Sequence, residues 1–386
     1  MQKLEIENIL NEIALSIINN KETNNYGLLS GLTGDAIFLY EYSKVEKKIS
    51  KYVEEHVDKI FLAIESNALD ISYCSGISGA CLGIDFIYKN FPDVYEKRFE
   101  FVSNEIENYI FPEYINLLND KNLDFLYGAI GIAFYFLERL KTGDRKYKKY
   151  INEILKHLNN TAIKSNDGIK WKQELNGCSY NISLSHGMAS IVIFLSEVLN
   201  SGNHFDINPK ILLEGGIKYI LNQEIDNKIH GSFFPYSSKE CKEEGSRLAW
   251  CYGDLGVGLA ILKASKVLNN SSLKNKAFKI FDFSATRKNL IENLVLDTSI
   301  CHGTSGIGCI YHDLYLQTNN KLYLNTSNYW ITETIKMYKE KKTFHLNNNI
   351  FDSDRASLLE GKTGIGLTLL KMYNGEHSDW TKFLLI

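Results

Sequence analysis

The sequence predicts an all-α protein, an α/α toroid in which a ring of seven inner helices lies inside a ring of seven outer ones. Three observations predict it: a glycine turn that recurs seven times, an apolar helix after each turn, and an amphipathic helix between successive turns. Four prolines in 386 residues also suit helices better than strands and tight turns. We therefore expect residues 1–386 to form a single domain of seven helix-pair repeats.

The glycine turns set the repeat. Each has the pattern G-x-x-G, or G-x-x-S in one case, followed by an apolar run. The leading glycines stand 45 to 66 residues apart, which leaves room for a second helix and two connections in every repeat. Glycine permits close approach and unusual backbone dihedrals where a Cβ would interfere. The leading glycines are Gly31, Gly76, Gly128, Gly187, Gly253, Gly303 and Gly361.

The two kinds of helix differ in their apolar pattern. Segments after the glycines, such as IVIFLSEVL at 191–199, are apolar nearly all round, which predicts burial on both sides. Segments between the turns, such as KKYINEILKHL at 148–158, have apolar residues at three- and four-residue steps and therefore a solvent face. Two concentric rings satisfy both patterns, and an open α-solenoid is the alternative arrangement.

Composition excludes several classes of function. The net charge of −3 comes from 43 basic and 46 acidic residues, without a basic block that would predict nucleic-acid binding. The first twenty residues have an amphipathic pattern instead of a signal peptide's apolar core, and no run approaches the ~18 apolar residues of a membrane span. We expect a cytoplasmic protein. Seven scattered cysteines favour free thiols or metal ligands over a disulfide framework.

The residues just before the leading glycines carry the candidate chemistry. Cys251 precedes one glycine, and the pair Cys301 and His302 precedes the next. If the turns face one another at one mouth of a ring, these side chains converge. Two thiolates and an imidazole suit Zn²⁺ and leave one tetrahedral position open, as in catalytic zinc sites. The alternative is that the cysteines only fill space, which is how we interpret Cys74, because no histidine accompanies it.

Two further turns offer acid–base groups. His186 occupies the corresponding position in another repeat, and Asp124 lies four residues ahead of Gly128. Both are candidates to face the same cavity, although a lone histidine in an apolar setting is more often a core residue. Arg247, four residues before Cys251, is suited to orient a carboxylate or to bind one on a substrate.

Three ordered motifs in this glycine frame carry a family resemblance. SHGMAS (185–190), WCYGDLG (250–256) and CHGTSG (301–306) make the sequence resemble the lanthionine synthetase C-like family, the lantibiotic cyclases, over nearly the whole chain. The resemblance implies an α/α toroid with a central zinc ion. It implies the ligands Cys251, Cys301 and His302, and catalytic positions at His186, Asp124, Arg247 and Tyr252. The sequence departs from the family pattern at Ser190, Leu255 and Ser305.

The resemblance also implies a reaction in the biosynthesis of lantibiotics, which are antibiotic bacteriocins. A precursor-peptide cysteine, ionised on zinc, would add to the β-carbon of dehydroalanine or dehydrobutyrine, and protonation at Cα would complete a lanthionine or methyllanthionine ring. We expect His186 to transfer the proton, Asp124 to tune it, Arg247 to position Asp124, and Tyr252 to donate a hydrogen bond to the enolate. The implied partners are the dehydrated peptide and a complex with a dehydratase and a membrane transporter.

Three alternatives stay open at this point. A glycosidase toroid needs two opposed carboxylates, for which the matched positions offer only Asp124 and Glu360. A zinc toroid of the prenyltransferase kind also activates thiols. A non-catalytic toroid would only hold zinc, a thiol or a peptide.

Overall fold

The computed structural model describes residues 2–20, 24–89, 107–173, 177, 179–242, 244–340 and 356–386. The chain divides into two compact units. Unit 1 contains residues 1–113 and 296–384 with Ile386, and unit 2 contains residues 114–295 with Leu385. Within the described ranges, no helix is both long enough and apolar enough to span a membrane.

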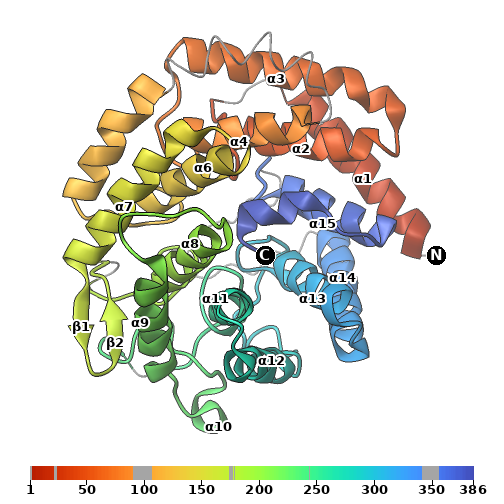
Figure 1. Cartoon of the computed structure of the whole chain (residues 1–386). Coiled ribbons are helices and arrows are strands. Elements are labelled where there is room, and N and C mark those ends of the chain that lie inside the picture. Colours follow the sequence, from red (N-terminus) through yellow and green to blue (C-terminus); the bar gives the residue numbers. More distant parts are fainter. Residues whose placement is uncertain are drawn as a thin grey trace. The chain divides into compact units, whose positions relative to one another are not determined.

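Unit 1 alternates the two expected kinds of helix. Its α15 packs against both α2 and α13, and α2 packs against α4, so the last repeat lies beside the first (Figure 1). The helices that follow glycine turns are α2 (Leu32–Ser43), α4 (Ile77–Tyr88), α13 (Thr304–Thr318) and α15 (Lys362–Asn374). The others are α1 (Gln2–Asn19), α3 (Ser50–Glu65) and α14 (Lys321–Glu340), with short 3₁₀ segments η1 (Lys47–Ile49) and η3 (Asp379–Leu384). Residues 107–119, where the chain passes from unit 1 to unit 2, are also helical.

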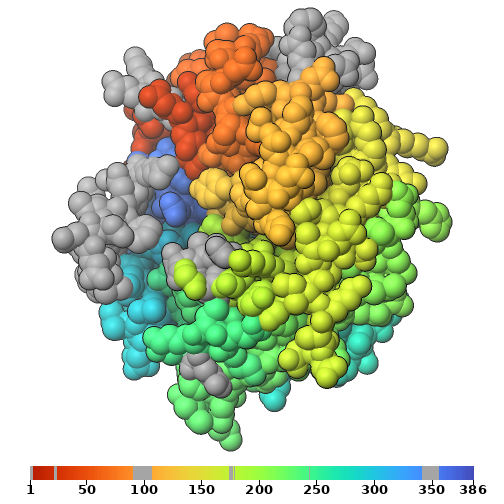
Figure 2. Space-filling model, turned by 90° about the vertical axis from the view of Figure 1, so that its left-hand side faces the viewer, coloured from red at the N-terminus to blue at the C-terminus, as the bar shows by residue number. Residues whose placement is uncertain are grey.

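Unit 2 repeats the same pattern, with α8 packed between α6 and α11 (Figure 1). Its glycine-led helices are α6 (Ala129–Lys141), α8 (Met188–Asn200) and α11 (Asp254–Val267). The others are η2 (Arg145–Tyr147), α7 (Lys148–Thr161), α9 (Pro209–Asn222), α10 (Asn227–His230) and α12 (Ser271–Ser284). Strands β1 (Ile163–Ser165) and β2 (Gly168–Lys170) form an antiparallel hairpin. Figure 2 shows α7 and this hairpin, in yellow and yellow-green, at the surface of the unit.

Burial separates the two kinds of helix as the apolar patterns predict. In α8, all residues from Met188 to Ser196 are buried, because apolar side chains occupy every face. In α7, the buried residues are Tyr150, Ile151, Ile154, Leu155 and Leu158, which form a stripe with three- and four-residue steps. Burying one such aliphatic side chain contributes about 1.5–3 kcal/mol, so the stripe is what attaches α7 to its neighbours.

Backbone hydrogen bonds join the glycine turns to one another at one end of the helices. In unit 1, Leu29 N donates to Cys74 O at 2.9 Å, Leu359 N donates to Leu29 O at 2.8 Å, and Cys301 N donates to Leu359 O at 2.9 Å. In unit 2, Leu184 N donates to Cys251 O at 3.0 Å. Within each unit, the turns are therefore side by side, as the sequence predicts.

Five of the described turns begin with an Asn or Asp six residues before the leading glycine. Asp297 is an example: its Oδ1 accepts a hydrogen bond from Ser299 N at 2.7 Å, and its carbonyl oxygen accepts one from Thr304 N at 3.0 Å. A Cβ on Gly303 would lie 2.2 Å from Asp297 Oδ1, so this position excludes any side chain. The other four residues of this kind are Asn25, Asp70, Asn122 and Asn181.

A buried carboxyl in unit 1 predicts a pH-dependent stability. Burial raises the pKa of Asp35 to about 7, although Thr363 donates to its carboxylate and the charge of Lys362 lies nearby. Between about pH 4 and pH 7, the folded protein keeps a proton on Asp35 that the unfolded chain releases. The contribution of this group to the free energy of unfolding therefore falls as the pH rises through that window.

Asp35→Asn cannot ionise, so its free energy of unfolding should decline less with rising pH than that of the wild type. The difference between the two proteins should change by on the order of 4 kcal/mol from pH 4 to pH 8 in favour of the variant. Urea unfolding at both pH values measures it. Parallel pH profiles for the two proteins would contradict the prediction.

Candidate active site

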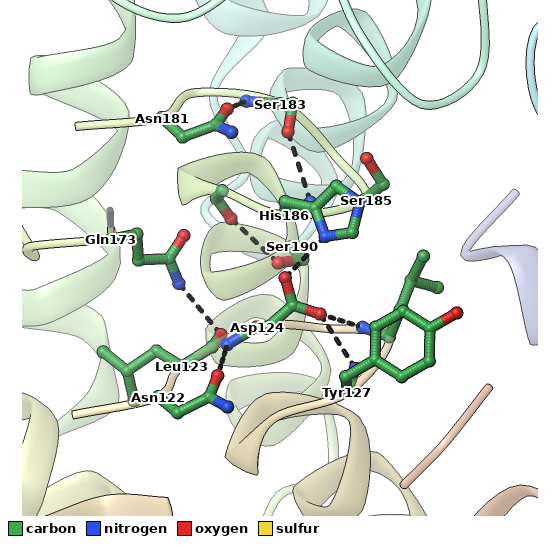
Figure 3. Close-up of polar contacts among 12 residues, drawn as sticks. Asn122, Leu123, Asp124, Tyr127, Gln173, Asn181, Ser183, Ser185, His186 and Ser190 are labelled. Atoms are coloured by element: carbon green, nitrogen blue, oxygen red, sulfur yellow. Dashed lines mark hydrogen bonds and ion pairs between the residues drawn. The ribbon is translucent and has the colours of Figure 1, made fainter. Parts of the chain in front are cut away.

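Asp124 and His186 form a hydrogen-bonded pair in unit 2 (Figure 3). They lie on the turns before α6 and α8, and His186 Nδ1 is 2.5 Å from Asp124 Oδ2. The other carboxylate oxygen of Asp124 accepts hydrogen bonds from the backbone N–H groups of Leu126 and Tyr127, at 2.7 and 2.8 Å. The carboxylate is thus held on both sides, and it holds the imidazole with the proton on Nδ1. That tautomer leaves Nε2 to accept or deliver a proton.

The surroundings of His186 tune its pKa. Burial is the largest effect and lowers the pKa, but the hydrogen bond and charge of Asp124, together with the charge of Cys251, outweigh it, so the pKa of His186 is raised. A histidine whose pKa is shifted upward from its ordinary value near 6.5 can carry a proton at neutral pH. The pair therefore has the chemistry of a general acid–base group.

Tyr252 lies beside this pair. Its ring centroid is 6.2 Å from that of His186, and the ring of Tyr236 stacks on it with 4.2 Å between ring centroids. Burial is the main reason that the pKa of Tyr252 is well above its usual range, with further contributions from Tyr236 and Cys251. The hydroxyl therefore stays neutral near pH 7 and can act as a hydrogen-bond donor.

The turn that carries Cys251 is built differently from the other glycine turns. Arg247 stands where five turns have Asn or Asp, and Gly253 has φ +83° whereas the six other leading glycines are extended. A Cβ on Gly253 would lie 2.6 Å from Arg247 O, and this φ favours glycine in any case. The prediction that unusual dihedrals require the leading glycine is therefore correct only at Gly253. At five other leading glycines, close approach is the reason, because a Cβ would lie 2.2–2.4 Å from a neighbouring atom: Gly31, Gly76, Gly128, Gly187 and Gly303.

A buried ion pair stabilises this turn, which lacks the Asn or Asp that stabilises five other turns. Arg287 donates to Ser246 O at 2.6 Å, to Asn293 Oδ1 at 2.8 Å and to Asp254 Oδ2 at 3.2 Å. Asp254, the first residue of α11, also accepts hydrogen bonds from the backbone N–H groups of Phe233 and Phe234. The loop between residues 246 and 254 is therefore tied to two other segments of unit 2.

Arg287→Met should lower the free energy of unfolding by roughly 3–5 kcal/mol, because it leaves the charge of Asp254 buried without its partner. Adding Asp254→Asn to that variant should recover part of the loss. Urea unfolding measures both. The exposed neighbour provides the control, since Lys288→Met should change the stability by less than about 0.5 kcal/mol. A similar small change for Arg287→Met would show that the pair does not hold the loop.

Cys301 and His302 lie on the turn before α13 in unit 1, and both are buried. His302 Nε2 is 3.0 Å from Asp297 Oδ2. Burial acts most strongly on Asp297 and raises its pKa, but the hydrogen bonds and charge of His302 and the hydrogen bonds of Ser299 outweigh it, so the pKa is lowered and the carboxylate stays ionised. This contact points Nε2 of the imidazole toward a carboxylate, an arrangement common behind metal-bound histidines, and makes His302 a candidate ligand through Nδ1.

The structure brings together some of the predicted site residues and not others. Within unit 2, His186 lies beside Asp124 and Tyr252. Arg247 instead donates from Nη2 to Leu294 O at 3.2 Å, and no contact with Asp124 supports its expected role in positioning that carboxylate. Its role in catalysis stays a prediction.

Several residues that support these groups do not follow from the sequence motifs. Asp297, Asp254, Arg287 and Gln173 were not singled out. A signal existed for the first, because Asn or Asp recurs six residues before the leading glycines. No repeat or motif marks Arg287, which reaches the Cys251 turn from beyond α12.

The cysteines are not all in the same state. Five buried cysteines are outside any disulfide: Cys74, Cys81, Cys251, Cys301 and Cys309. Cys241 is disulfide-bonded, so the expectation of free thiols or metal ligands is wrong for this residue. Cys178 lies outside the described residues.

Helix-pair repeats whose glycine turns carry thiols, imidazoles and a carboxylate define the class of protein: an all-helical fold with candidate acid–base and metal-binding groups at one end of its helices. Residues 22–385 match the family described as "Lanthionine synthetase C-like protein", and the chain belongs to this family. The sequence is similar to "Nisin biosynthesis protein NisC" of Lactococcus lactis subsp. lactis, with 28% identity over 431 residues that cover 100% of this chain and 95% of that protein. The structure is similar to that of "Nisin cyclase", with a TM-score of 0.77, 21% identity, and coverage of 99% and 97% of the two chains.

These similarities confirm three predictions. The fold is that of the α/α toroid of nisin cyclase, as the repeats predict. The resemblance to the lanthionine synthetase C-like family is correct over most of the chain. The class of enzyme is that of the thioether-forming cyclases. The prediction that residues 1–386 form one domain stays a prediction.

Proposed function

We propose that this protein is a zinc-dependent lanthipeptide cyclase that closes thioether rings in a dehydrated precursor peptide. The observation that carries the proposal is the Asp124–His186 pair, because it supplies an oriented proton carrier on the same kind of glycine turn that carries the candidate metal ligands. Membership in the lanthionine synthetase C-like family supports the type of reaction.

Zinc is the metal that suits the candidate ligands best. Cys251 and Cys301 each offer a thiol sulfur and His302 offers an imidazole nitrogen. Two sulfurs and one nitrogen match the ligand preference of Zn²⁺, and three protein ligands leave a position for a substrate sulfur. Asp297 would orient His302 in this site, as its 3.0 Å contact indicates. Bound zinc would supply the positive charge that keeps a thiol ionised at neutral pH.

The residues of this chain would then transfer the proton that the reaction moves. The reaction forms a bond between the peptide's cysteine sulfur and the β-carbon of a dehydro residue, and the α-carbon gains the proton that the thiol has lost. His186 would accept or deliver that proton at Nε2, because Asp124 occupies Nδ1. Tyr252, kept neutral by burial, would donate a hydrogen bond to the oxygen of the enolate.

The test uses a peptide that contains one dehydroalanine and one cysteine. Ring closure leaves the mass unchanged, because the reaction is an isomerisation, but it removes the free thiol. Incubation with the zinc-loaded protein should therefore abolish thiol alkylation without changing the mass. Alkylation that continues at the level of the enzyme-free control would reject the cyclase proposal.

The glycosidase alternative is less well supported. Such an enzyme needs one carboxyl group as a free acid and a second as base or nucleophile. Both oxygens of Asp124 are occupied, one by His186 and the other by two backbone N–H groups. This arrangement suits a residue that orients a histidine.

The similarity to a nisin biosynthesis protein and to nisin cyclase supports a precursor peptide as the binding partner. A complex with a dehydratase and a membrane transporter, and a cytoplasmic location, stay predictions. Copurification of a dehydratase with the tagged protein would test the complex.

A further inference from the structure

Tyr252 is nearly buried, although the pair beside it borders a pocket. Asp124 and His186 line this pocket of about 460 Å³, so a molecule in it lies next to the group that would transfer the proton. The ring of Tyr252 has its centroid 6.2 Å from that of His186, but only 7% of the residue is exposed. A group that binds a transition state must be held to within about 0.5 Å. The residues packed against the Tyr252 ring therefore matter for the proposed role of its hydroxyl.

A second tyrosine in the same turn position gives a comparison within unit 2. Tyr127 (Figure 3) and Tyr252 each stand one residue before a leading glycine. Tyr127 is 51% exposed and Tyr252 is 7% exposed, so the turn position does not by itself bury the side chain. Residues from other segments cover Tyr252, and Tyr236 is one of them. Its ring lies face to face with that of Tyr252, with 4.2 Å between centroids and 4° between the ring planes.

Tyr236 is itself 42% exposed, but its backbone is attached on both sides. The residue before it, Pro235, forms an antiparallel β-bridge with Gly245, and the carbonyl oxygen of Ser237 accepts a hydrogen bond from Ile182 N at 3.3 Å. The first contact joins the segment to the loop that ends at α11, and the second joins it to the turn before α8. The ring of Tyr236 therefore projects from a fixed piece of backbone.

One carboxylate attaches both tyrosines to the same point. Asp254 lies two residues after Tyr252, at the start of α11. Its carboxylate accepts hydrogen bonds from the backbone N–H groups of Phe233 and Phe234, each at 3.0 Å, just before Tyr236. Each ring thus stands within three residues of a shared buried anchor, which keeps the two tyrosines in register with each other.

Without the ring of Tyr236, two things would change at Tyr252. Its phenol ring would lose a face-to-face aromatic contact, which would allow the side chain to turn to other rotamers. Water would also reach the uncovered face and weaken the hydrogen bond that the hydroxyl makes in a drier site. Neither change involves the contact between Asp124 and His186, so the proton carrier would stay in place.

We propose that Tyr236 is a positioning residue for ring closure: its ring stacks on Tyr252 and keeps the Tyr252 hydroxyl where it would bind the enolate oxygen. This inference rests on the proposed cyclase function and adds a residue to it. Because Tyr236 acts through the stack, its aromatic ring is required and its own hydroxyl is not.

The first test compares two substitutions of Tyr236 in the zinc-loaded protein. The rate of thiol loss from the peptide with one dehydroalanine and one cysteine gives kcat and KM. Tyr236→Ala should lower kcat by roughly 10-fold, and by no more than the roughly 10²-fold that a misplacement of about 1 Å can cost, with KM near the wild-type value. Tyr236→Phe keeps the stacked pair and should keep kcat within about twofold of the wild type.

The second test asks whether Tyr236 acts through the hydroxyl of Tyr252. Tyr252→Phe retains the ring and removes that hydroxyl, so Tyr236→Ala should lower kcat no further in this background. Tyr109→Ala is the matched control, because Tyr109 is 39% exposed and lies in unit 1, where its hydroxyl donates to Leu69 O. This control should leave kcat near its starting value in both backgrounds, and every variant should retain its zinc.

Equal losses of kcat from Tyr236→Ala in the two backgrounds would overturn the inference, and so would wild-type activity in Tyr236→Ala or in Tyr252→Phe. If Tyr236→Ala does not fold, Tyr236→Leu takes its place, since leucine fills space without a stacked ring and should show the same loss. The alkylation assay on the wild type decides the cyclase proposal separately. A protein that closes rings but shows additive losses would therefore refute only the role of Tyr236.

Discussion

Cys301→Ala is expected to lose bound zinc and ring-forming activity together. The substitution removes one of the three proposed ligands, and a two-ligand site with one thiol holds zinc poorly. The loss of activity should exceed the roughly 10–100-fold that follows when only an outer hydrogen-bond partner of a ligand is removed. Metal analysis of the purified protein and the thiol-alkylation assay give the two readouts.

Cys74→Ala is the matched control for this experiment. Cys74 has the same position in its turn, two residues before a leading glycine, and it is also buried and outside any disulfide, but no histidine follows it. We interpret it as a packing residue, so its removal should leave the zinc content and the activity near the wild-type level. A Cys301→Ala protein that keeps one equivalent of zinc would contradict the assignment of this ligand.

His186→Asn is expected to keep the metal and to lose turnover by roughly 10²–10⁴-fold, the contribution typical of a general acid–base group. Asparagine retains a polar side chain that can bond to Asp124, but it cannot carry a proton between its partners. Three measurements separate metal binding, peptide binding and turnover. They are the metal content, the Kd of a dehydroalanine peptide with serine in place of cysteine, and the rate of thiol loss. Only the rate should change.

His157→Asn is the control, because His157 is another partly buried histidine of unit 2 and lies on α7, outside the pocket. It should leave the rate within about twofold of the wild type, as expected for a substitution away from the reacting groups. Full activity in His186→Asn would require another group to transfer the proton, and Tyr252 would be the next to test.

The repeat could be predicted from sequence because its causes are local. Apolar residues on all faces of 191–199 require burial on both sides, and the stripe in 148–158 requires one solvent face, whatever the rest of the chain does. The glycines of the turns were found for the same reason. The Asn or Asp six residues before them is an equally local signal, because it bonds within its own turn.

The site was predictable only in part, because its contacts join residues far apart in the sequence. The positions of Cys251, Cys301 and His302 relative to their glycines mark them as candidates. The 2.5 Å bond between Asp124 and His186, however, joins residues 62 positions apart, and only the packing of α6 against α8 places their turns together. Arg247 was a reasonable partner for a carboxylate, but its turn directs it to Leu294 O.

The sequence by itself determined the class of fold, the seven-turn frame and the residue types that carry the chemistry, since periodicity and turn composition are properties of short segments. The tertiary structure decided which of these residues touch: that Asp124 holds His186, and that Asp254 and Arg287 hold the Cys251 turn. Such contacts depend on side-chain directions and distances between segments, and neither follows from a local pattern.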